Sequence, residues 1–558
     1  MKRLPVLFLL IILAMTRGEA QLTFRNPILS GFYPDPGICR AGNDYYIVNS
    51  SFAYFPGLPV FHSTDLVSWK QIGNAMDRKE QLDLAGAGVS RGLFAPTIRY
   101  HNGLFYIVCT LIDKGGNFII TASDPKGPWS NPIWLPQADG IDPSLFFDDD
   151  NRAYLVYNSI PPDNKPLYDG HRTIRLAELD AKTLQVITAN MIIVNGGTDI
   201  SQKPVWIEAP HIFKKDGWYY LICAEGGTGY NHSEVVFRSK LVSGPYVPYA
   251  GNPILTQRHL DPARKNPVTT AGHADFVETP DGRWYAVFLA CRPYEGDHYN
   301  IGRETFMMPV QWKDGWPHLL QGNEEVQYEY PVPFPSVTQK VVNPYGGNAV
   351  YKDDFSGQSL DPRFMFLRTV EHPWYSLAEK KGYLAMDVRP ETAGEKVNPS
   401  FVAFRQQNHA CEAITALRFS PAAENEKAGL ALFQNETHFY YLCQSVSGGK
   451  PVVQLFQSGK DSSMVLVASR VLRRAPKQLY LKIEGRGPGY FFSYSTNNKR
   501  WTCLTKEEMD GKFLSTKTAG GFVGSVFGLY ATSLGKAGSS KAFFDFFSYT
   551  GNDDVYKK

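Results

Sequence analysis

Three acidic residues stand at the starts of similar sequence segments and could together do acid–base chemistry. They are Asp35, Asp142 and Glu208. Pro follows Asp35 and Asp142 directly, and it follows Glu208 after Ala209. When two carboxyl groups face one reacting bond, one can donate a proton while the other, ionised, activates water or attacks carbon. A single acidic residue before Pro is usually a turn former, so this chemistry requires the three side chains to converge.

The segments that follow these residues repeat one design, which predicts the elements that position them. Each has a short strand, a turn rich in Asn, Asp or Gly, and a second strand rich in aromatic and β-branched residues, which is typical of a β-hairpin. The five segments begin at Asp35, Ala95, Asp142, Glu208 and His273. Related turn sequences follow three of them, at residues 63–69, 122–129 and 239–246.

The spacing of the hairpins predicts an all-β fold that begins with a five-bladed β-propeller. The hairpins recur at intervals of roughly 47 to 67 residues, which leaves room for four strands per unit. A β-sandwich is the alternative, but it does not explain a similar hairpin that returns five times. The innermost strands of propeller blades run along the central axis, so residues at their starts ring one mouth of the channel. We therefore expect the three carboxylates and His273 to meet there.

Three carboxylates at one channel mouth suit the hydrolysis of a glycosidic bond. One carboxyl group must be protonated to donate to the leaving oxygen, and the other must be ionised. A third carboxylate near the acid would raise its pKa by repulsion and keep it protonated near neutral pH. Like charges held close together cost energy, and functional sites are where this cost is tolerated.

Length, net charge and composition indicate the class of protein. A chain of 558 residues is too long for one hydrophobic core, so two or three domains are expected. The formal charge is +3 and shows no basic stripe, so we expect neither a nucleic acid partner nor a charged membrane partner. The aromatic fraction is 14%, which favours β-structure first and sugar-stacking surfaces second.

The first twenty residues are typical of an export signal. Lys2 and Arg3 precede the apolar stretch 5–15, and small residues at 18 and 20 fit a cleavage site. This predicts a signal peptide over residues 1–20, and therefore a periplasmic or extracellular protein. No later stretch reaches about 18 apolar residues, so no membrane insertion is expected.

Seven cysteines are widely spaced and lack the CxxC pattern of metal sites. Because the number is odd, a dense disulfide framework is not expected. We expect most of them to be buried free thiols, and a single disulfide is the alternative.

The pattern changes after residue 318. The propeller is expected over residues 21–318, and residues 319–350, rich in Pro, Gly, Asn and Val, are expected to be a linker. Short alternating strands with frequent turns then predict a β-sandwich over residues 351–558.

The chain resembles glycoside hydrolase family 43, in the branch of β-xylosidases and α-L-arabinofuranosidases with a C-terminal β-sandwich. The resemblance runs from about Phe24 to the end of the chain. The motifs that carry it, in order, are residues 26–40, 50–57, 65–69, 140–146, 224–232, 271–274 and 302–305. It implies a five-bladed propeller followed by a concanavalin-like sandwich. It also implies an inverting, exo-acting enzyme that releases terminal β-D-xylose or α-L-arabinofuranose from xylan or arabinoxylan-type polysaccharides or their oligosaccharides.

The resemblance also implies roles for the three carboxylates. Asp35, in Tyr-Pro-Asp-Pro-Gly, matches the family's general base, and Glu208 matches its general acid. Asp142 matches the carboxylate that tunes and orients the acid.

Further residues match positions around the substrate. Phe52 and Phe94 match walls of the terminal-sugar pocket, Arg303 matches an arginine that contacts sugar hydroxyls, and Phe522 matches an aromatic on a sandwich loop that closes the pocket. The alternatives are core packing for Phe52 and Phe94, a surface role for Arg303, and an independent sugar-binding module for the sandwich.

His273 matches an axial histidine that organises the site or holds an ion by way of waters, and the alternative is a buried, hydrogen-bonded histidine. No cofactor is required by this chemistry. A structural divalent cation such as calcium is the one ion to consider.

Two positions depart from the family pattern. Ala209 stands where the family usually has Gly, so an added methyl group could crowd the leaving-group side. Phe94 stands where β-xylosidases of this branch often carry Trp, which favours an arabinofuranosidase. Other hypotheses are a non-catalytic carbohydrate-binding propeller, a glycosidase for another terminal sugar, and a sialidase, whose Asp-box is only partly matched by residues 63–69.

Overall fold

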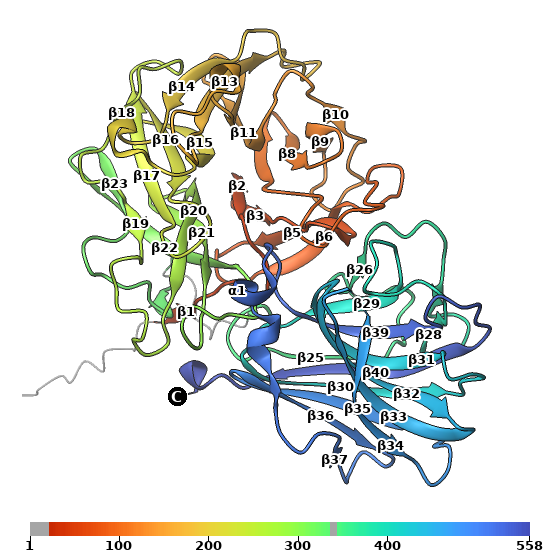
Figure 1. Ribbon diagram of the computed structural model, residues 1–558. Coiled ribbons are helices and arrows are strands. Elements are labelled where there is room, and N and C mark those ends of the chain that lie inside the picture. Colours follow the sequence, from red (N-terminus) through yellow and green to blue (C-terminus); the bar gives the residue numbers. More distant parts are fainter. Residues whose placement is uncertain (1–21, 335–342, 462, 558) are drawn as a thin grey trace, which may run out of the picture.

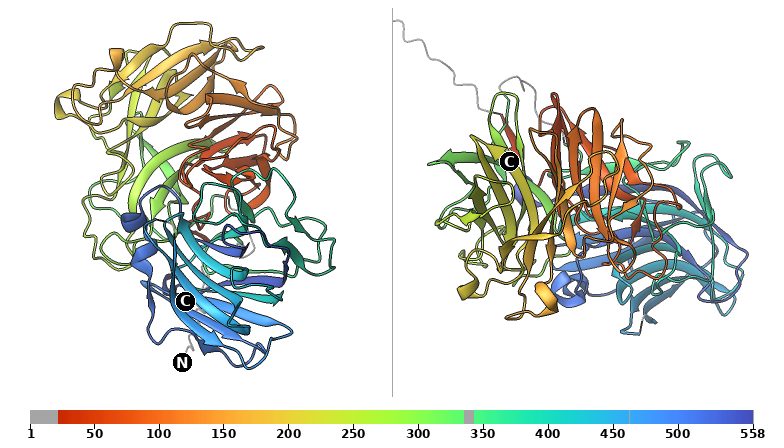
Figure 2. Two further views of the ribbon diagram at one scale, coloured as in Figure 1. Left: turned by 45° about the vertical axis from the view of Figure 1, so that its right-hand side comes forward. Right: turned by 90° about the horizontal axis from the view of Figure 1, so that it is seen from above.

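The computed structural model describes residues 22–334, 343–461 and 463–557 and shows two β-domains side by side (Figures 1 and 2). The predicted signal peptide, 1–20, and part of the predicted linker lie outside the described residues. Nearly all regular structure is β-strand, as predicted. Within the described ranges, no helix is both long and apolar enough to cross a membrane.

Five antiparallel sheets, each built from strands that lie close together along the chain, form the propeller and confirm the predicted fold class. Blade 1 contains β2 (Gly37–Ala41), β3 (Asp44–Val48), β5 (Gly57–Ser63) and β6 (Lys70–Met76). Blade 2 contains β7 (Thr97–His101), β8 (Leu104–Leu111), β9 (Gly116–Ala122) and β10 (Ile133–Trp134). Blade 3 contains β11 (Ile141–Phe147), β12 (Ala153–Ser159), β13 (Thr173–Leu179) and β14 (Met191–Asn195). Blade 4 contains β15 (Glu208–Lys215), β16 (Trp218–Glu225), β17 (Ser233–Ser239), β18 (Val247–Pro248) and β19 (Leu255–Thr256). Blade 5 contains β20 (Thr269–Glu278), β21 (Trp284–Cys291), β22 (Glu304–Lys313) and β23 (Trp316–His318).

Each predicted hairpin forms the two inner strands of a blade, and the three related turn sequences connect third and fourth strands. The second strands are apolar on both faces because each blade packs between two others. β12 and β21 are buried at every residue. The apolar clusters accordingly lie between neighbouring blades, such as the one that joins β16 and β17 to β20, β21 and β22. Burial between blades is what holds the ring of sheets together.

A partly buried ion pair crosses the propeller axis. Arg99, in blade 2, donates to both carboxylate oxygens of Asp275, in blade 5, with N–O distances of 2.8 and 3.1 Å. The same carboxylate accepts the backbone N–H of Ile38, in blade 1, at 2.9 Å. Three blades are thereby tied to one side chain, which fixes the inner strands whose starts carry the candidate site.

The second domain packs two large sheets face to face, as a sandwich. One sheet contains β25 (Val350–Asp353), β27 (Tyr375–Ser376), β28 (Leu384–Asp387), β30 (Ala410–Phe419), β35 (Leu479–Arg486), β36 (Gly489–Ser495), β37 (Thr502–Cys503), β38 (Met509–Asp510) and β40 (Lys541–Gly551). The other contains β26 (Met365–Leu367), β29 (Ser400–Arg405), β31 (Lys427–Asn435), β32 (His438–Ser447), β33 (Lys450–Ser458), β34 (Met464–Val471) and β39 (Val526–Thr532). Helix α1 (Thr516–Ala519) follows the 3₁₀ turn η3 (Gly511–Leu514) and lies where the two domains meet.

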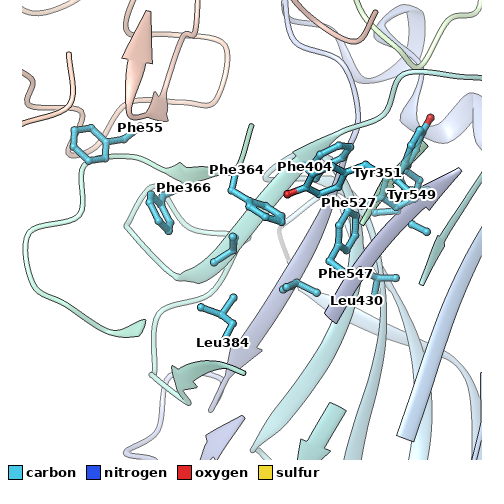
Figure 3. Packing of buried hydrophobic residues seen from close by; sticks show 14 of the residues in the cluster. Phe55, Tyr351, Phe364, Phe366, Leu384, Phe404, Leu430, Phe527, Phe547 and Tyr549 are labelled. Carbon is cyan, nitrogen blue, oxygen red and sulfur yellow. The ribbon is translucent and has the colours of Figure 1, made fainter. Parts of the chain in front are cut away.

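The two domains share a core. Strand β4 (Tyr54–Phe55), from the connection inside blade 1, pairs with β26 and so adds a strand to the second sheet of the sandwich. Phe55 opposes Phe366 in that pairing, and Figure 3 shows both near the aromatic core of the sandwich. Phe55 therefore packs in the core and does not line the pocket. The sequence did not predict that the core would continue across the domain border.

The predicted linker lies between β23, which ends at His318, and β25, which begins at Val350. Part of it is regular, because β24 (Glu329–Pro331) pairs with β1 (Thr23–Arg25) at the start of the described chain. All seven cysteines are free thiols, and all but Cys503 are buried, which confirms the prediction for most of them.

Candidate active site

A pocket of about 200 Å³ opens at one mouth of the propeller channel. All eight residues singled out from the sequence line it. They are Asp35, Phe52, Phe94, Asp142, Glu208, His273, Arg303 and Phe522. The predicted convergence of the three carboxylates with His273 is therefore what the structure shows.

Local backbone distortions aim these side chains into the pocket. Asp35, Asp142, Ala209 and His273 all adopt left-handed φ angles of 52° to 55° at the starts of inner strands. The pairing register shifts beside the last three, as in a β-bulge. Such conformations cost energy for residues other than Gly and cluster at functional sites. Glu208 stands one residue before this shared position, which is why Pro follows it only after Ala209.

Asp35 is buried but held ionised. Arg303 Nη1 donates to its Oδ1 at 2.8 Å, and the Ser50 hydroxyl donates to its Oδ2 at 2.6 Å. Burial alone would raise the pKa of Asp35, but the Arg303 charge and the Ser50 hydrogen bond outweigh burial and leave this pKa below its usual range. An ionised carboxylate that lines the pocket can accept a proton from water.

Asp142 and Glu208 behave in the opposite way. Burial raises the pKa of Glu208 to about 7, and the Asp35 charge acts in the same direction. Burial and the negative charges of Glu208 and Asp35 raise the pKa of Asp142 well above its usual range. The sequence analysis expected Asp142 to raise the pKa of Glu208 by repulsion. In the structure the causes that raise the pKa of Glu208 are burial and the Asp35 charge, and the repulsion between Asp142 and Glu208 acts on the pKa of Asp142. The two carboxyl groups therefore interact and are expected to titrate as a pair.

This arrangement predicts a bell-shaped pH dependence of kcat/KM with its basic limb near pH 7. In the wild-type protein, losing the last proton of the Asp142–Glu208 pair leaves two neighbouring negative charges. With Asn at position 142, losing the proton of Glu208 leaves only one. Asp142→Asn should therefore move the basic limb to lower pH. The check is the pH profile on an aryl pentoside, with Asp149→Asn as control because the Asp149 side chain is 83% exposed. A basic limb that stays in place would contradict the coupling.

His273 is buried beside Asp35, with 3.7 Å between its Nδ1 and Asp35 Oδ1. Burial lowers the pKa of His273 to about 4, so the ring is neutral at ordinary pH. Its ring lies 6.5 Å, between centroids, from that of His211, which in turn meets Arg99 at 3.2 Å. Within the described ranges, no group of three or more His, Cys, Asp or Glu side chains is placed to hold a metal ion. An ion held by His273 by way of waters stays a prediction.

Three phenylalanines wall the pocket, and one comes from the sandwich. The Phe522 ring stacks on Phe52, with centroids 6.1 Å apart, and meets Phe94 edge-on at 5.9 Å. The Arg303 guanidinium lies 5.3 Å from the centroid of the Phe522 ring. The Phe522 N–H donates to Ser90 Oγ at 2.9 Å. The sandwich thus completes the pocket.

Glycines allow the Phe522 loop to lie against the propeller. A Cβ on Gly524 would lie 2.0 Å from the carbonyl oxygen of Ile301, and one on Gly302 would lie 2.7 Å from Gly524 N. The neighbouring Ser525 N–H donates to Asn300 O at 2.7 Å. The two backbones therefore run at a separation that no side chain permits.

Gly524→Ala should force these backbones apart. We expect a loss of stability of about 1–3 kcal/mol, as in other overpacked sites, and lower activity because Phe522 withdraws. The measurements are the thermal midpoint and kcat/KM on an aryl pentoside. Gly73→Ala is the control, because a Cβ there meets only the Lys126 carbonyl oxygen, at 3.4 Å. Equal stability and activity for the two variants would contradict the close approach.

Sequence reasoning missed several pocket residues. They are Arg91, Ala95, Ile141, Asn158, Arg172, Trp206 and Thr228. Ile141 and Thr228 lie inside the motifs that carried the resemblance, and Ala95 begins the second hairpin. The sequence therefore contained a signal that could have identified these three residues as part of the site. Arg172 and Trp206 lie in irregular connections that follow no repeat. The methyl group of Ala209 is buried, and Ala209 does not line the pocket, so the expected crowding of the leaving-group side is not seen.

Comparison with known proteins agrees with this geometry. Residues 24–317 match "Glycosyl hydrolases family 43", and residues 352–550 match "Beta xylosidase C-terminal Concanavalin A-like domain". A "Xylosidase/arabinosidase" from Butyrivibrio fibrisolvens is 40% identical over 541 residues, covering 94% of this chain and 98% of its own. A "Non-reducing end alpha-L-arabinofuranosidase" from Bacteroides ovatus is 36% identical over 535 residues, covering 95% of each chain.

A solved structure is also similar along nearly the whole chain. It is a family 43 enzyme from a capybara gut metagenome, with a TM-score of 0.85, 41% identity, and coverage of 92% of this chain and 96% of its own. The predicted resemblance and the predicted enzyme class are confirmed. The chain belongs to glycosyl hydrolase family 43 and carries the concanavalin-like C-terminal domain of its β-xylosidase branch.

Proposed function

We propose that the protein is an inverting, exo-acting glycosidase that releases terminal β-D-xylose or α-L-arabinofuranose from xylan or arabinoxylan-type polysaccharides or their oligosaccharides. The observation that carries the proposal is the opposite titration of its buried carboxyl groups. The pKa of Asp35 is held low, and those of Glu208 and Asp142 are raised, within one pocket. Inverting hydrolysis needs this division between an ionised base and a protonated acid.

Asp35 acts as the general base in this proposal. Its carboxylate takes a proton from a water molecule as the water oxygen bonds to the anomeric carbon. Arg303 and Ser50 each donate to one of its oxygens, which keeps the carboxylate ionised and fixes its orientation. Arg303 lines the pocket, so its remaining donors suit the sugar hydroxyls.

Glu208 acts as the general acid. As the bond between the anomeric carbon and the leaving oxygen breaks, Glu208 transfers its proton to that oxygen. Thr228 donates to Glu208 Oε1 at 3.3 Å and orients the acid, and the negative charge of an ionised Glu208 raises the pKa of Asp142. Hydrolysis by two carboxyl groups needs no organic or redox cofactor.

The shape of the pocket supports exo action on a small terminal sugar. Phe52, Phe94 and Phe522 pack against one another and close one side of the pocket, so a chain cannot continue through that wall. The names of the relatives support a pentose as the sugar released. Export to the periplasm or the exterior is part of the proposal, on the basis of residues 1–20 alone.

A direct comparison of two substrates tests the proposed function. Hydrolysis of aryl β-D-xylopyranoside and aryl α-L-arabinofuranoside is measured side by side. At least one should turn over, and Phe94 at the wall leads us to expect the arabinofuranoside to be faster. Turnover of neither, together with failure on xylo- and arabinoxylo-oligosaccharides, would contradict the proposal and favour a carbohydrate-binding role.

A further inference from the structure

One large aromatic side chain at the pocket differs from the three phenylalanines. Trp206 lines the pocket, yet 40% of its surface is exposed, whereas Phe52 is 1% exposed. It precedes the proposed acid by two residues, and Ile207 between them is buried. Because the acid protonates the leaving oxygen, the leaving sugar must lie on the Glu208 side of the pocket. Trp206 therefore stands where the substrate emerges.

The protein holds this indole in a strained conformation. Trp206 has a left-handed φ of 51°, which is rare for a bulky residue. Its N–H donates to Gly170 O at 2.8 Å, and the preceding carbonyl, of Val205, accepts the N–H of Gly226 at 2.8 Å. A Cβ on Gly170 would lie 3.0 Å from the Trp206 ring. An exposed ring held at such a cost calls for a partner outside the chain.

A cation lies beside the Trp206 ring. The Arg172 guanidinium lies 5.9 Å from the centroid of the Trp206 ring and also lines the pocket. Large apolar side chains are exposed on the same two connections, β12 to β13 and β14 to β15. These are Ile160, Leu167, Ile200 and Val205. An aromatic face with an adjacent hydrogen-bond donor suits a sugar ring, which presents C–H groups on its faces and hydroxyls at its edge.

We propose that Trp206 and Arg172 form the leaving-group subsite, in which the Trp206 ring stacks on the first backbone pyranose beyond the bond that is cut and Arg172 binds its hydroxyls. The inference rests on the proposed glycosidase function. It makes Trp206 a specificity-determining residue: it favours substrates whose leaving group is a sugar ring.

The test compares two alkoxide leaving groups that both need protonation by the acid. One substrate is the disaccharide in which the released pentose is joined to xylose. The other is the methyl glycoside of the same pentose, whose leaving group has no ring. The ratio of their kcat/KM values isolates contacts with the leaving sugar, because any loss of folded enzyme, or any misplacement of Glu208, affects both substrates alike.

The variants are chosen so that the backbone survives. Trp206→Asn removes the ring, and Asn tolerates the left-handed φ. We expect the ratio of disaccharide to methyl glycoside to fall at least tenfold in this variant, and Trp206→Phe to restore most of it. The control is Trp134→Asn, because Trp134 is similarly exposed, at 37%, on the outer strand β10 and does not line the pocket. The control should keep the wild-type ratio.

Three results are distinguishable. A ratio in Trp206→Asn within twofold of wild type would overturn the subsite, including the case in which both activities fall together because Trp206 only positions Glu208. A selective loss on the disaccharide would support it. If the wild-type protein hydrolyses neither substrate, the proposed function fails and the subsite falls with it.

Discussion

Replacing Asp35 with Asn is expected to lower kcat by about 10²–10⁴-fold on every substrate, whatever its leaving group. The amide cannot take a proton from the attacking water, and the other two carboxyl groups among the described residues that line the pocket, Glu208 and Asp142, have raised pKa values. The measurement is kcat on an aryl pentoside and on the corresponding pentosyl fluoride.

The fold should survive this change. Asn tolerates the left-handed φ of 52° at position 35. Its one side-chain oxygen can accept from Arg303, as Oδ1 of Asp35 does, and the Ser50 hydroxyl can rotate to accept from the Asn amide. Binding of the released pentose, measured by calorimetry, is the control for an intact pocket. Asp35→Asn protein that binds the sugar and turns over within tenfold of wild type would show that Asp35 is not the base.

Replacing Glu208 with Gln is expected to produce a loss that depends on the leaving group. On disaccharides kcat should fall by about 10²–10⁴-fold, because the sugar oxygen leaves without a proton. On the pentosyl fluoride the loss should be much smaller, because fluoride departs without protonation. Gln resembles the neutral acid in shape and can still accept from Thr228.

The contrast between the two variants separates the base from the acid. Asp35→Asn should lower kcat on the disaccharide and on the pentosyl fluoride to the same extent. Glu208→Gln should lower kcat selectively on the disaccharide. Equal losses on both substrates in Glu208→Gln would mean that Glu208 supports the pocket rather than donating the proton. A selective loss in Asp35→Asn would mean that the two roles are exchanged.

The fold could be predicted in outline because the propeller repeats. The hairpins that begin at Asp35, Ala95, Asp142, Glu208 and His273 fall on the inner two strands of each blade. Their alternation and turns are local signals that need no knowledge of tertiary contacts. The short strand β4 gave no such signal. Its two residues pair with β26, more than 300 residues away, so only the tertiary structure reveals that the cores join.

The residues of the candidate site could also be predicted only in part. The three carboxylates were found because they stand at one place in the repeat. Phe522 came from the resemblance, since no pattern tells which sandwich loop reaches the propeller. Contacts across the axis, such as Arg99 with Asp275, join blades that are not neighbours and follow from no spacing in the sequence. Trp206 was missed because strained exposure of an aromatic ring is a property of the folded chain.

The anomeric form of the first product tests the central claim most directly. Hydrolysis of the preferred pentoside is followed by proton NMR from the first turnovers, before the free sugar equilibrates between its anomers. Direct attack by a water that Asp35 activates predicts that the sugar appears first with the configuration opposite to that of the substrate. Initial release of the same configuration would require a covalent intermediate on a carboxylate, and it would contradict the roles assigned to Asp35 and Glu208.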